Sequence, residues 1–141
     1  MGYYFIKAII EGDPIAKKQL RCSCIHGKAK LYQPSSKDQA RISEIFKTYM
    51  GFNKPYACPV KQTVRVYVKI PKSVSKGDRL AMQKSIILPD KKPDLDNYVY
   101  MISNAGTGIL YDDDKRICQT EHYKFYEDFL GPRTEVIIRP I

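Results

Sequence analysis

Apolar and polar side chains alternate along residues 62–70, where aliphatic residues at every second position face one way and Thr, Arg, Tyr and Lys face the other. This period of two predicts a strand with one buried face and one wet face. Aromatic and β-branched residues fill 2–10 and end at a Gly-Asp-Pro turn, which predicts a second strand. Residues 116–126 and 133–141, on either side of a turn at 128–132, predict two more strands.

Apolar side chains recur at helical spacing after Ser35 and Ser36, either of which can cap a helix that runs to about residue 50. A shorter helix over 97–105 is predicted after Asp94 or Asp96, because either aspartate can serve as its N-cap and glycines follow its end. Residues 15–36 lack periodicity and predict a loop that can hold a short hairpin around His26-Gly27. The Ser-, Gly- and Pro-containing stretch 71–93 predicts an exposed loop.

The order of these elements is strand, helix, strand, helix, strand, strand. This order predicts an α+β fold with a mixed or antiparallel sheet and helices packed on one side. The 141 residues, 43% of them hydrophobic, fit a single domain over 1–141, and no internal repeat or long linker divides them.

The charge balance predicts a polyanionic partner. The chain carries 24 Lys and Arg against 15 Asp and Glu, a formal net charge of +9, which makes nucleic acid the first candidate. No run approaches the roughly 18 apolar residues of a membrane span, and no secretory pattern is visible, so we expect a cytoplasmic protein without a membrane partner. Four cysteines are too few for a disulfide scaffold and are expected to be reduced thiols.

Basic residues gather in two stretches. Residues 14–37 contain Lys and Arg but no Asp or Glu, and only two aspartates dilute the basic stretch 72–92. Lysine and arginine side chains on such stretches bind phosphates of nucleic acid. We therefore expect these residues to contact DNA: Lys17, Lys18, Arg21, Lys28, Lys30, Lys72, Lys76 and Lys92.

The sign of the charge reverses between residues 94 and 114, which hold five aspartates and no Lys, Arg or His. If Pro93 keeps the backbone extended, the spacing of Asp94 and Asp96 points both carboxylates to one side. Mg²⁺ binds one or two carboxylates together with water and substrate phosphate, so a third aspartate from 112–114 would complete a metal site. Such a site hydrolyses phosphodiesters; the alternative interpretation is a pair of solvated acidic turns.

Four motifs follow one another between about residues 60 and 125. A predicted strand ends in IPKS (70–73), KPDLDN (92–97) opens a helix, DDKRI (113–117) forms an acidic turn, and Lys124 comes seven residues later. In this order they resemble the RusA family of Holliday-junction resolvases, which phages and prophages often carry. The chain is therefore identified as a member of that family by resemblance.

The resemblance implies a Mg²⁺-dependent homodimeric endodeoxyribonuclease that nicks two opposed strands of a four-way DNA junction. Asp94, Asp96 and Asp114 would be the catalytic, metal-binding carboxylates. Asp113 takes the role of Asp114 if the loop before it is shifted by one residue. Lys124 matches the later lysine of the family pattern and would be a catalytic cation near the metal.

One position departs from the family pattern. Members usually carry a lysine four residues after the second aspartate, on the helix face of the metal site, and Tyr100 stands there in this chain. A phenol is neutral at pH 7 and cannot replace a cation near the scissile phosphate. We expect Lys124, and after it Lys92, to supply that charge.

Two other functions stay open. The protein can bind nucleic acid without cleaving it, with the carboxylates serving as caps, or the same metal chemistry can act on RNA or flap substrates. No P-loop or dinucleotide-binding glycine pattern occurs, so no nucleotide cofactor is expected. His122 is expected to be a hydrogen-bonded sheet histidine; the alternative is a position next to the metal-binding residues. Four tyrosines near basic segments can stack on bases, although packing is the commoner role: Tyr32, Tyr67, Tyr98 and Tyr100.

Overall fold

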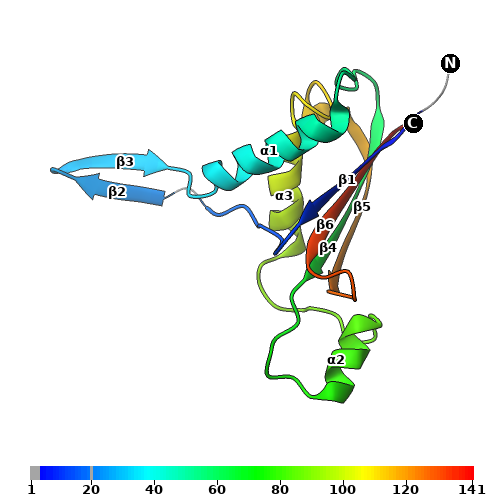
Figure 1. Ribbon diagram of the computed structural model, residues 1–141. Coiled ribbons are helices and arrows are strands. Elements are labelled where there is room, and N and C mark those ends of the chain that lie inside the picture. The colour runs from blue at the N-terminus through cyan, green and yellow to red at the C-terminus, as the bar shows by residue number, and fades with distance from the viewer. Residues whose placement is uncertain (1–3, 20) are drawn as a thin grey trace.

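A four-stranded mixed sheet forms one side of the body of the molecule (Figure 1). Its strands follow the order β1 (Ile6–Glu11), β6 (Arg133–Pro140), β4 (Val60–Val68) and β5 (Ile117–Tyr126). β6 pairs antiparallel with β1 and with β4, whereas β4 and β5 run parallel. The computed structural model describes residues 4–19 and 21–141, without the side chains of Arg21 and Ile25.

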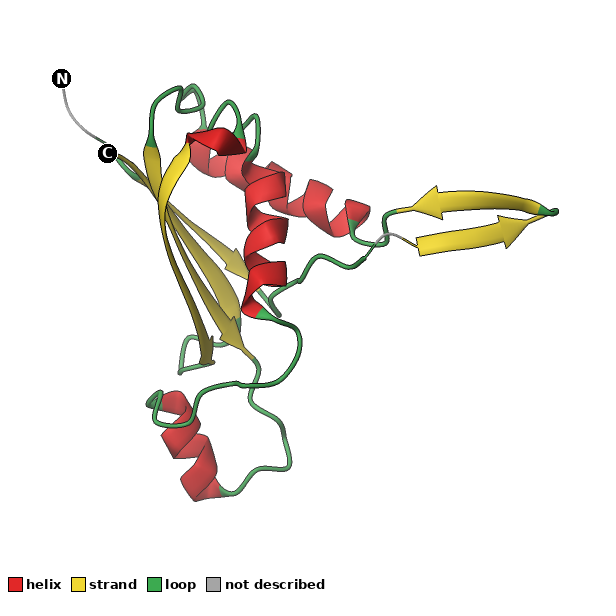
Figure 2. Ribbon diagram, turned by 180° about the vertical axis from the view of Figure 1, so that it is seen from behind, coloured by secondary structure: helices red, strands yellow, loops and turns green. Residues whose placement is uncertain are grey.

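Helices α1 (Ser36–Met50) and α3 (Leu95–Gly106) cover one face of this sheet (Figures 1 and 2). The covered face receives alternate side chains of β4, so that Val64 and Val66 are fully buried, as the period of two predicted. They pack in one core with Ile42 and Phe46 of α1. Burial of this apolar surface is the main stabilising contribution. The predicted α+β fold, with a mixed sheet and helices on one side, is confirmed.

The opposite face of the sheet is polar and aromatic. Arg133 is 4% exposed and donates hydrogen bonds to Asp128 at 2.8 and 3.2 Å and to Glu135 at 2.9 Å. Its guanidinium lies 3.8 Å from the ring centroid of Tyr67, and Arg65 lies 3.9 Å from Glu135. These pairings compensate the partial burial of charge on this face.

The stretch 71–93, predicted to be a loop, contains a helix, α2 (Lys76–Gln83). The side chain of its N-cap, Ser75, accepts a hydrogen bond from the backbone N–H of Asp78 at 3.1 Å. Met82 packs with Ile70 and Tyr126 in a small second core. The prediction of a loop was wrong: α2 is only eight residues long, and the Ser, Gly and Pro residues in and around it are also typical of loops.

β2 (Arg21–Ile25) and β3 (Lys28–Tyr32) form a separate antiparallel hairpin, which we call the arm (residues 21–32). The arm projects from the body of the molecule in both views (Figures 1 and 2). His26 and Gly27 at its tip have φ values of 52° and 78°, as a tight two-residue hairpin turn requires. The hairpin expected around these two residues is therefore confirmed. β3 is exposed along its whole length, so the arm offers a free surface.

Candidate active site

The first turn of α3 carries two of the predicted metal-binding residues. Asp94 is the N-cap, in extended conformation, and Leu95 and Asp96 already belong to the helix. The expected extended stretch thus ends at Asp94, because the helix starts immediately after its cap. The carboxylate of Asp94 makes no capping hydrogen bond. Among the residues that the structure describes, neither carboxylate forms a hydrogen bond or an ion pair.

Lys124 joins β5 to the segment that precedes this turn. Its ammonium donates hydrogen bonds to the backbone carbonyl of Lys91 at 2.6 Å and to that of Pro93 at 2.9 Å. Lys124 pairs with Val66 across the parallel ladder, so it lies on the sheet face that α3 covers. The structure therefore brings Lys124 to the start of α3, next to Asp94.

His122 lies two residues before Lys124 and shares its face of β5. Burial lowers the pKa of His122, and the nearby carboxylate of Asp96 opposes that shift. Its Nε2 is buried and has no hydrogen-bond partner in the described part of the chain. The expected hydrogen-bonded sheet histidine was wrong on this atom. The alternative, a position next to the candidate site, agrees with the nearby carboxylate of Asp96.

The acidic turn 112–114 lies at the other end of α3. The backbone N–H groups of Ile109 and Leu110 donate to the carbonyl of Gly106, the last residue of the helix. Tyr111 is buried, and its hydroxyl lies 2.9 Å from Oε1 of Gln62 and 3.3 Å from the carbonyl of Ser103. A helix rises about 1.5 Å per residue, so roughly 15 Å of α3 separates the two acidic segments.

Two carboxylates of this turn bind groups of the turn itself. Arg116 donates to both carboxylate oxygens of Asp112, at 2.8 and 3.0 Å, and this lowers the pKa of Asp112. The backbone N–H of Lys115 donates to Asp113 at 2.9 Å and is the main cause of the lowered pKa of Asp113. Asp114 opens the short helix η1 (Asp114–Arg116), which contacts α3.

The chain thus carries Asp94 and Asp96 at the first turn of α3, whereas Asp113 and Asp114 lie beyond its other end. Consistent with this separation, no three His, Cys, Asp or Glu side chains gather into a metal-holding group within residues 4–19 and 21–141. The order of motifs along the chain did not reveal the separation, since it results from the length and direction of α3.

Two basic clefts adjoin the first turns of α3. The first, of about 190 Å³, is lined by Lys69, Lys91, Lys92 and Lys124 together with Tyr98 and Tyr126. The second, of about 360 Å³, is lined by Lys17, Lys18, Asn97 and Tyr100 with two glutamines. The predicted DNA contacts at positions 17, 18 and 92 therefore border the candidate site.

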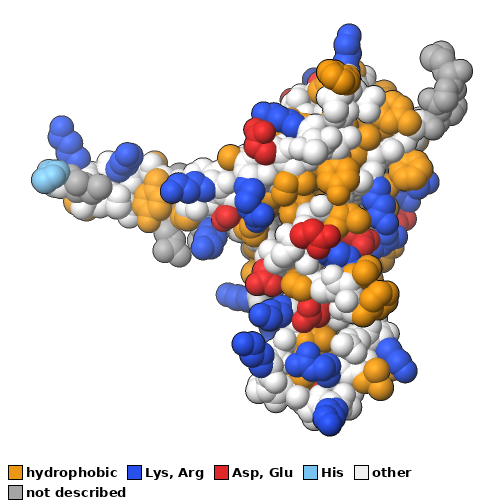
Figure 3. Space-filling view, in the orientation of Figure 1, with side chains coloured by type: hydrophobic (Ala, Val, Ile, Leu, Met, Phe, Trp, Pro, Cys, Tyr) orange, Lys and Arg blue, Asp and Glu red, His pale blue; other side chains and the backbone are white. Residues whose placement is uncertain are grey.

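The remaining predicted DNA contacts lie farther out. Lys28 and Lys30 are exposed on β3, and Lys72 and Lys76 are exposed after β4 and at the start of α2. The backbone of Arg21 begins β2, but its side chain lies outside the described residues. Figure 3 shows Lys and Arg side chains gathered along the arm and over the α2 end of the body.

The tyrosines divide between packing and exposure. Tyr98 is 5% exposed and packs in the main core, and Tyr67 lies under Arg133. Tyr32 is 42% exposed and Tyr100 is 56% exposed. Of these four, Tyr32 and Tyr100 are the ones with a ring accessible for stacking on a base.

Lysines line both clefts at the start of α3, and surfaces of this kind bind the phosphates of nucleic acid. The chain belongs to the RusA endodeoxyribonuclease family: the family model described as endodeoxyribonuclease RusA matches residues 11–139. Over 145 residues it is also 33% identical to the protein YqaN of Bacillus subtilis (strain 168), described as uncharacterized, with 96% of each chain covered. The family resolves Holliday junctions, so DNA is the polyanionic partner. None of the helices in the described part of the chain has the length and apolar character needed to cross a bilayer.

Proposed function

We propose that this protein is a Mg²⁺-dependent, structure-selective endonuclease that resolves four-way DNA junctions in the cytoplasm. The observation that carries the proposal is that Asp94 and Asp96, at the start of α3, bind no group of the described chain, while residues of the same helix turns line two lysine-rich clefts. Adjacent like charges repel unless a cation lies among them. A divalent cation beside phosphate-binding lysines is the arrangement that phosphodiester hydrolysis needs.

The donor set fits a hard cation. Asp94 and Asp96 supply carboxylate oxygens, and Mg²⁺ takes one or two of these and completes its shell with water and substrate phosphate. Bound there, the metal would supply a nucleophilic water and neutralise charge on the phosphoryl oxygens. Nε2 of His122 is buried without a hydrogen-bond partner in the described part of the chain, and the carboxylate of Asp96 is nearby. A water molecule held at the metal site would give this nitrogen a partner.

The side chains of the chain hold the substrate and the reacting phosphate. In hydrolysis the water oxygen bonds to phosphorus and the bond from phosphorus to one bridging sugar oxygen breaks; one water proton ends on that sugar oxygen and the other on the new phosphate. Lys124 holds the 91–93 backbone in place and keeps one ammonium hydrogen for a phosphate oxygen. Lys92 adds a second cation to the same cleft.

The proposed active enzyme is a homodimer, as the family resemblance implies, and the position of Asp114 gives a structural reason for it. Because one chain keeps Asp114 at the far end of α3, a three-aspartate site requires Asp114 from a second copy. A homodimer with two-fold symmetry then forms two such sites, each with Asp94 and Asp96 from one protomer. Two sites match the two opposed strands that a junction resolvase nicks.

Mixing of two inactive variants tests this arrangement. Asp96→Asn chains and Asp114→Asn chains are each expected to be inactive, but a mixed dimer with a shared site has one intact site, so about one site in four recovers after random exchange. Nicking that returns after mixing supports the shared site. A mixture that stays inactive, with mixed dimers verified by mass spectrometry, places Asp114 outside such a site.

The proposed activity itself is tested on a panel of labelled DNAs. A four-way junction, a duplex of the same arms and a single strand are incubated with the protein, with and without Mg²⁺, and products are resolved on gels. We expect symmetric nicks in the junction alone and only with Mg²⁺. Junction binding without cleavage under all metal conditions would instead make the protein a non-catalytic junction binder.

A further inference from the structure

Lys17 is held in place by groups from two helices. Its ammonium lies 5.0 Å from the ring centroid of Tyr100 on α3, within the range of a cation–π contact. The same ammonium donates a hydrogen bond to Oε1 of Gln39 on α1 at 3.2 Å. A lysine side chain is usually mobile on a protein surface, but this one has its charged end fixed between α1 and α3.

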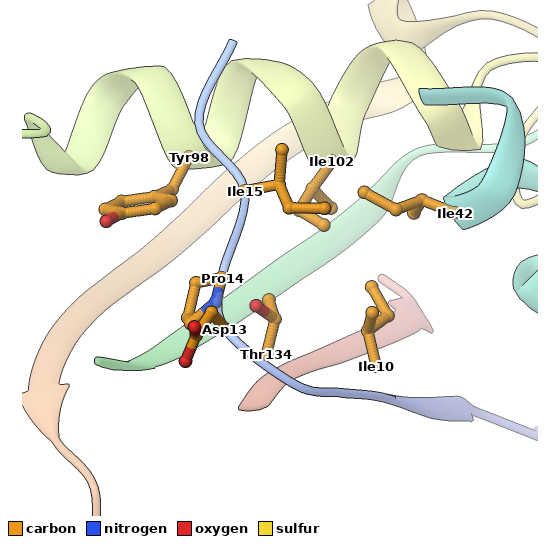
Figure 4. A pocket seen from close by; sticks show the side chains of 8 residues that line it. All are labelled: Ile10, Asp13, Pro14, Ile15, Ile42, Tyr98, Ile102 and Thr134. Carbon is orange, nitrogen blue, oxygen red and sulfur yellow. The ribbon is translucent and has the colours of Figure 1, made fainter. Parts of the chain in front are cut away.

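The backbone around Lys17 is fixed as well. The N–H of Lys17 donates to the carbonyl of Asn97, in the first turn of α3, at 3.0 Å. Two residues earlier, Ile15 packs against the main core. Figure 4 shows this segment running from the sheet to α3, where Ile15 lies beside Ile102. The gap left there is only about 10 Å³, so the segment is closely packed.

This arrangement sets a cation beside the proposed metal-binding carboxylates. Tyr100 follows Asp96 by four residues, and side chains at that spacing are neighbours on a helix surface. One face of Tyr100, the residue that departs from the family pattern, thus lies near a positive charge from another segment. Since Gln39 takes one of the three ammonium hydrogens, others stay free toward the 360 Å³ cleft.

We propose that Lys17 contacts the scissile phosphate and stabilises its developing negative charge, with Tyr100 and Gln39 as the residues that position it. This inference rests on the proposed function and assigns Lys17 a part in the chemical step, not only in general DNA affinity. Lys17 exchanges no proton in that step; it donates a hydrogen bond to a phosphate oxygen. Lys18, exposed in the same cleft, is the comparison residue, because no described group fixes its ammonium.

The test compares single-turnover cleavage of a saturated junction complex by matched variants. Lys17→Met keeps the aliphatic stem over Tyr100 and removes the charge; we expect the chemical step to slow about 10²-fold. Lys18→Met should weaken binding, measured by fluorescence anisotropy in EDTA, and should slow that step far less than Lys17→Met does. Tyr100→Phe should stay close to wild type, whereas Tyr100→Leu should slow the step by about 2- to 5-fold, the scale of an exposed cation–π contact.

A double variant that moves the positive charge to another residue shows whether a slower chemical step results from the missing charge or from misfolding. Lys17→Met combined with Tyr100→Lys returns a cation to the same helix face and should recover most of the lost rate, and thermal unfolding shows whether each variant folds. Equal chemical steps for Lys17→Met and Lys18→Met, in a protein whose wild type cleaves, would overturn the role of Lys17 alone. A wild type that binds junctions but cleaves none would overturn the proposed function and this inference together.

Discussion

The two ends of α3 carry carboxylates of different kinds. At its start, Asp94 and Asp96 form no hydrogen bond or ion pair with the described chain, whereas beyond its end Asp112 is bound by Arg116 and Asp113 by the N–H of Lys115. Carboxylates with partners of their own stabilise a local turn. Neighbouring carboxylates without partners repel each other and are available to an external cation. Within one set of motifs, the carboxylates of the turn thus stabilise local structure, whereas the carboxylates at the start of α3 are the ones we propose for metal binding.

The largest expected effect is at the start of α3. Asp94→Asn and Asp96→Asn each remove a proposed metal ligand, and the loss of several kcal/mol of charge stabilisation should slow cleavage by about 10³-fold or more. Junction binding should be equal or tighter, because a repulsion with phosphate is removed. Cleavage rates and anisotropy titrations check this, with exposed Asp90→Asn as the matched control. A wild-type rate in either variant would remove that residue from the site.

Substitutions in the acidic turn should affect the cleavage rate differently at each aspartate. Asp114→Asn is expected to abolish cleavage, whereas Asp112→Asn should change the rate by no more than about twofold, the usual scale for an exposed surface position. The unfolding midpoint of Asp112→Asn should fall slightly, because Arg116 loses its bidentate partner. Rate and stability are measured on the same preparations. A dominant catalytic loss at Asp112 would shift the metal-binding role within this turn.

The salt dependence of DNA affinity should show whether the lysines of the arm contact phosphates and other exposed lysines do not. Each lysine that neutralises a phosphate adds about 0.9 to the log–log slope of affinity against salt, so Lys28→Ala combined with Lys30→Ala should lower the slope by nearly two units. Lys54→Ala, an exposed lysine away from the arm, is the control. An unchanged slope in the arm variant would show that the arm does not contact DNA phosphates.

The smallest expected effect concerns acid stability. The pKa of Asp112 is lowered in the folded protein by its hydrogen bonds from Arg116. A lowered folded-state pKa contributes stability above the unfolded-state pKa, and this contribution is lost as the pH falls through the folded value. Urea unfolding at pH 3 and pH 7 should therefore show a smaller drop for Asp112→Asn than for wild type. An identical drop would mean that Arg116 does not stabilise the turn in solution.

The parts of the structure that depend on local pattern could be predicted. The alternation in 62–70 correctly predicted the buried face of β4, although the strand begins and ends two residues earlier than predicted. The apolar spacing after Ser36 predicted α1. Gly27 marked the hairpin, because a left-handed turn favours glycine. The carboxylate pair at the start of α3 was also visible, since KPDLDN contains both a cap and the beginning of a helix.

The parts that depend on tertiary contacts could not be predicted. α2 is marked by one buried side chain, and Lys17 reaches Tyr100 and Gln39 through contacts between residues far apart in the sequence. Likewise, Lys124 lies beside Pro93 because β4 and β5 run parallel, a pairing that no local pattern specifies. The separation of the two acidic segments follows from the orientation of α3 in the fold.

The position of β6 has a consequence for synthesis of the chain on the ribosome. β6 is the last strand along the chain, yet it lies inside the sheet between β1 and β4. Until it emerges, β1 and β4 present unpaired edges, which are sites of aggregation and of chaperone binding. A nascent chain that stops before β6 therefore leaves the sheet open, so a premature stop is expected to yield a target for proteolysis instead of a partly folded nuclease.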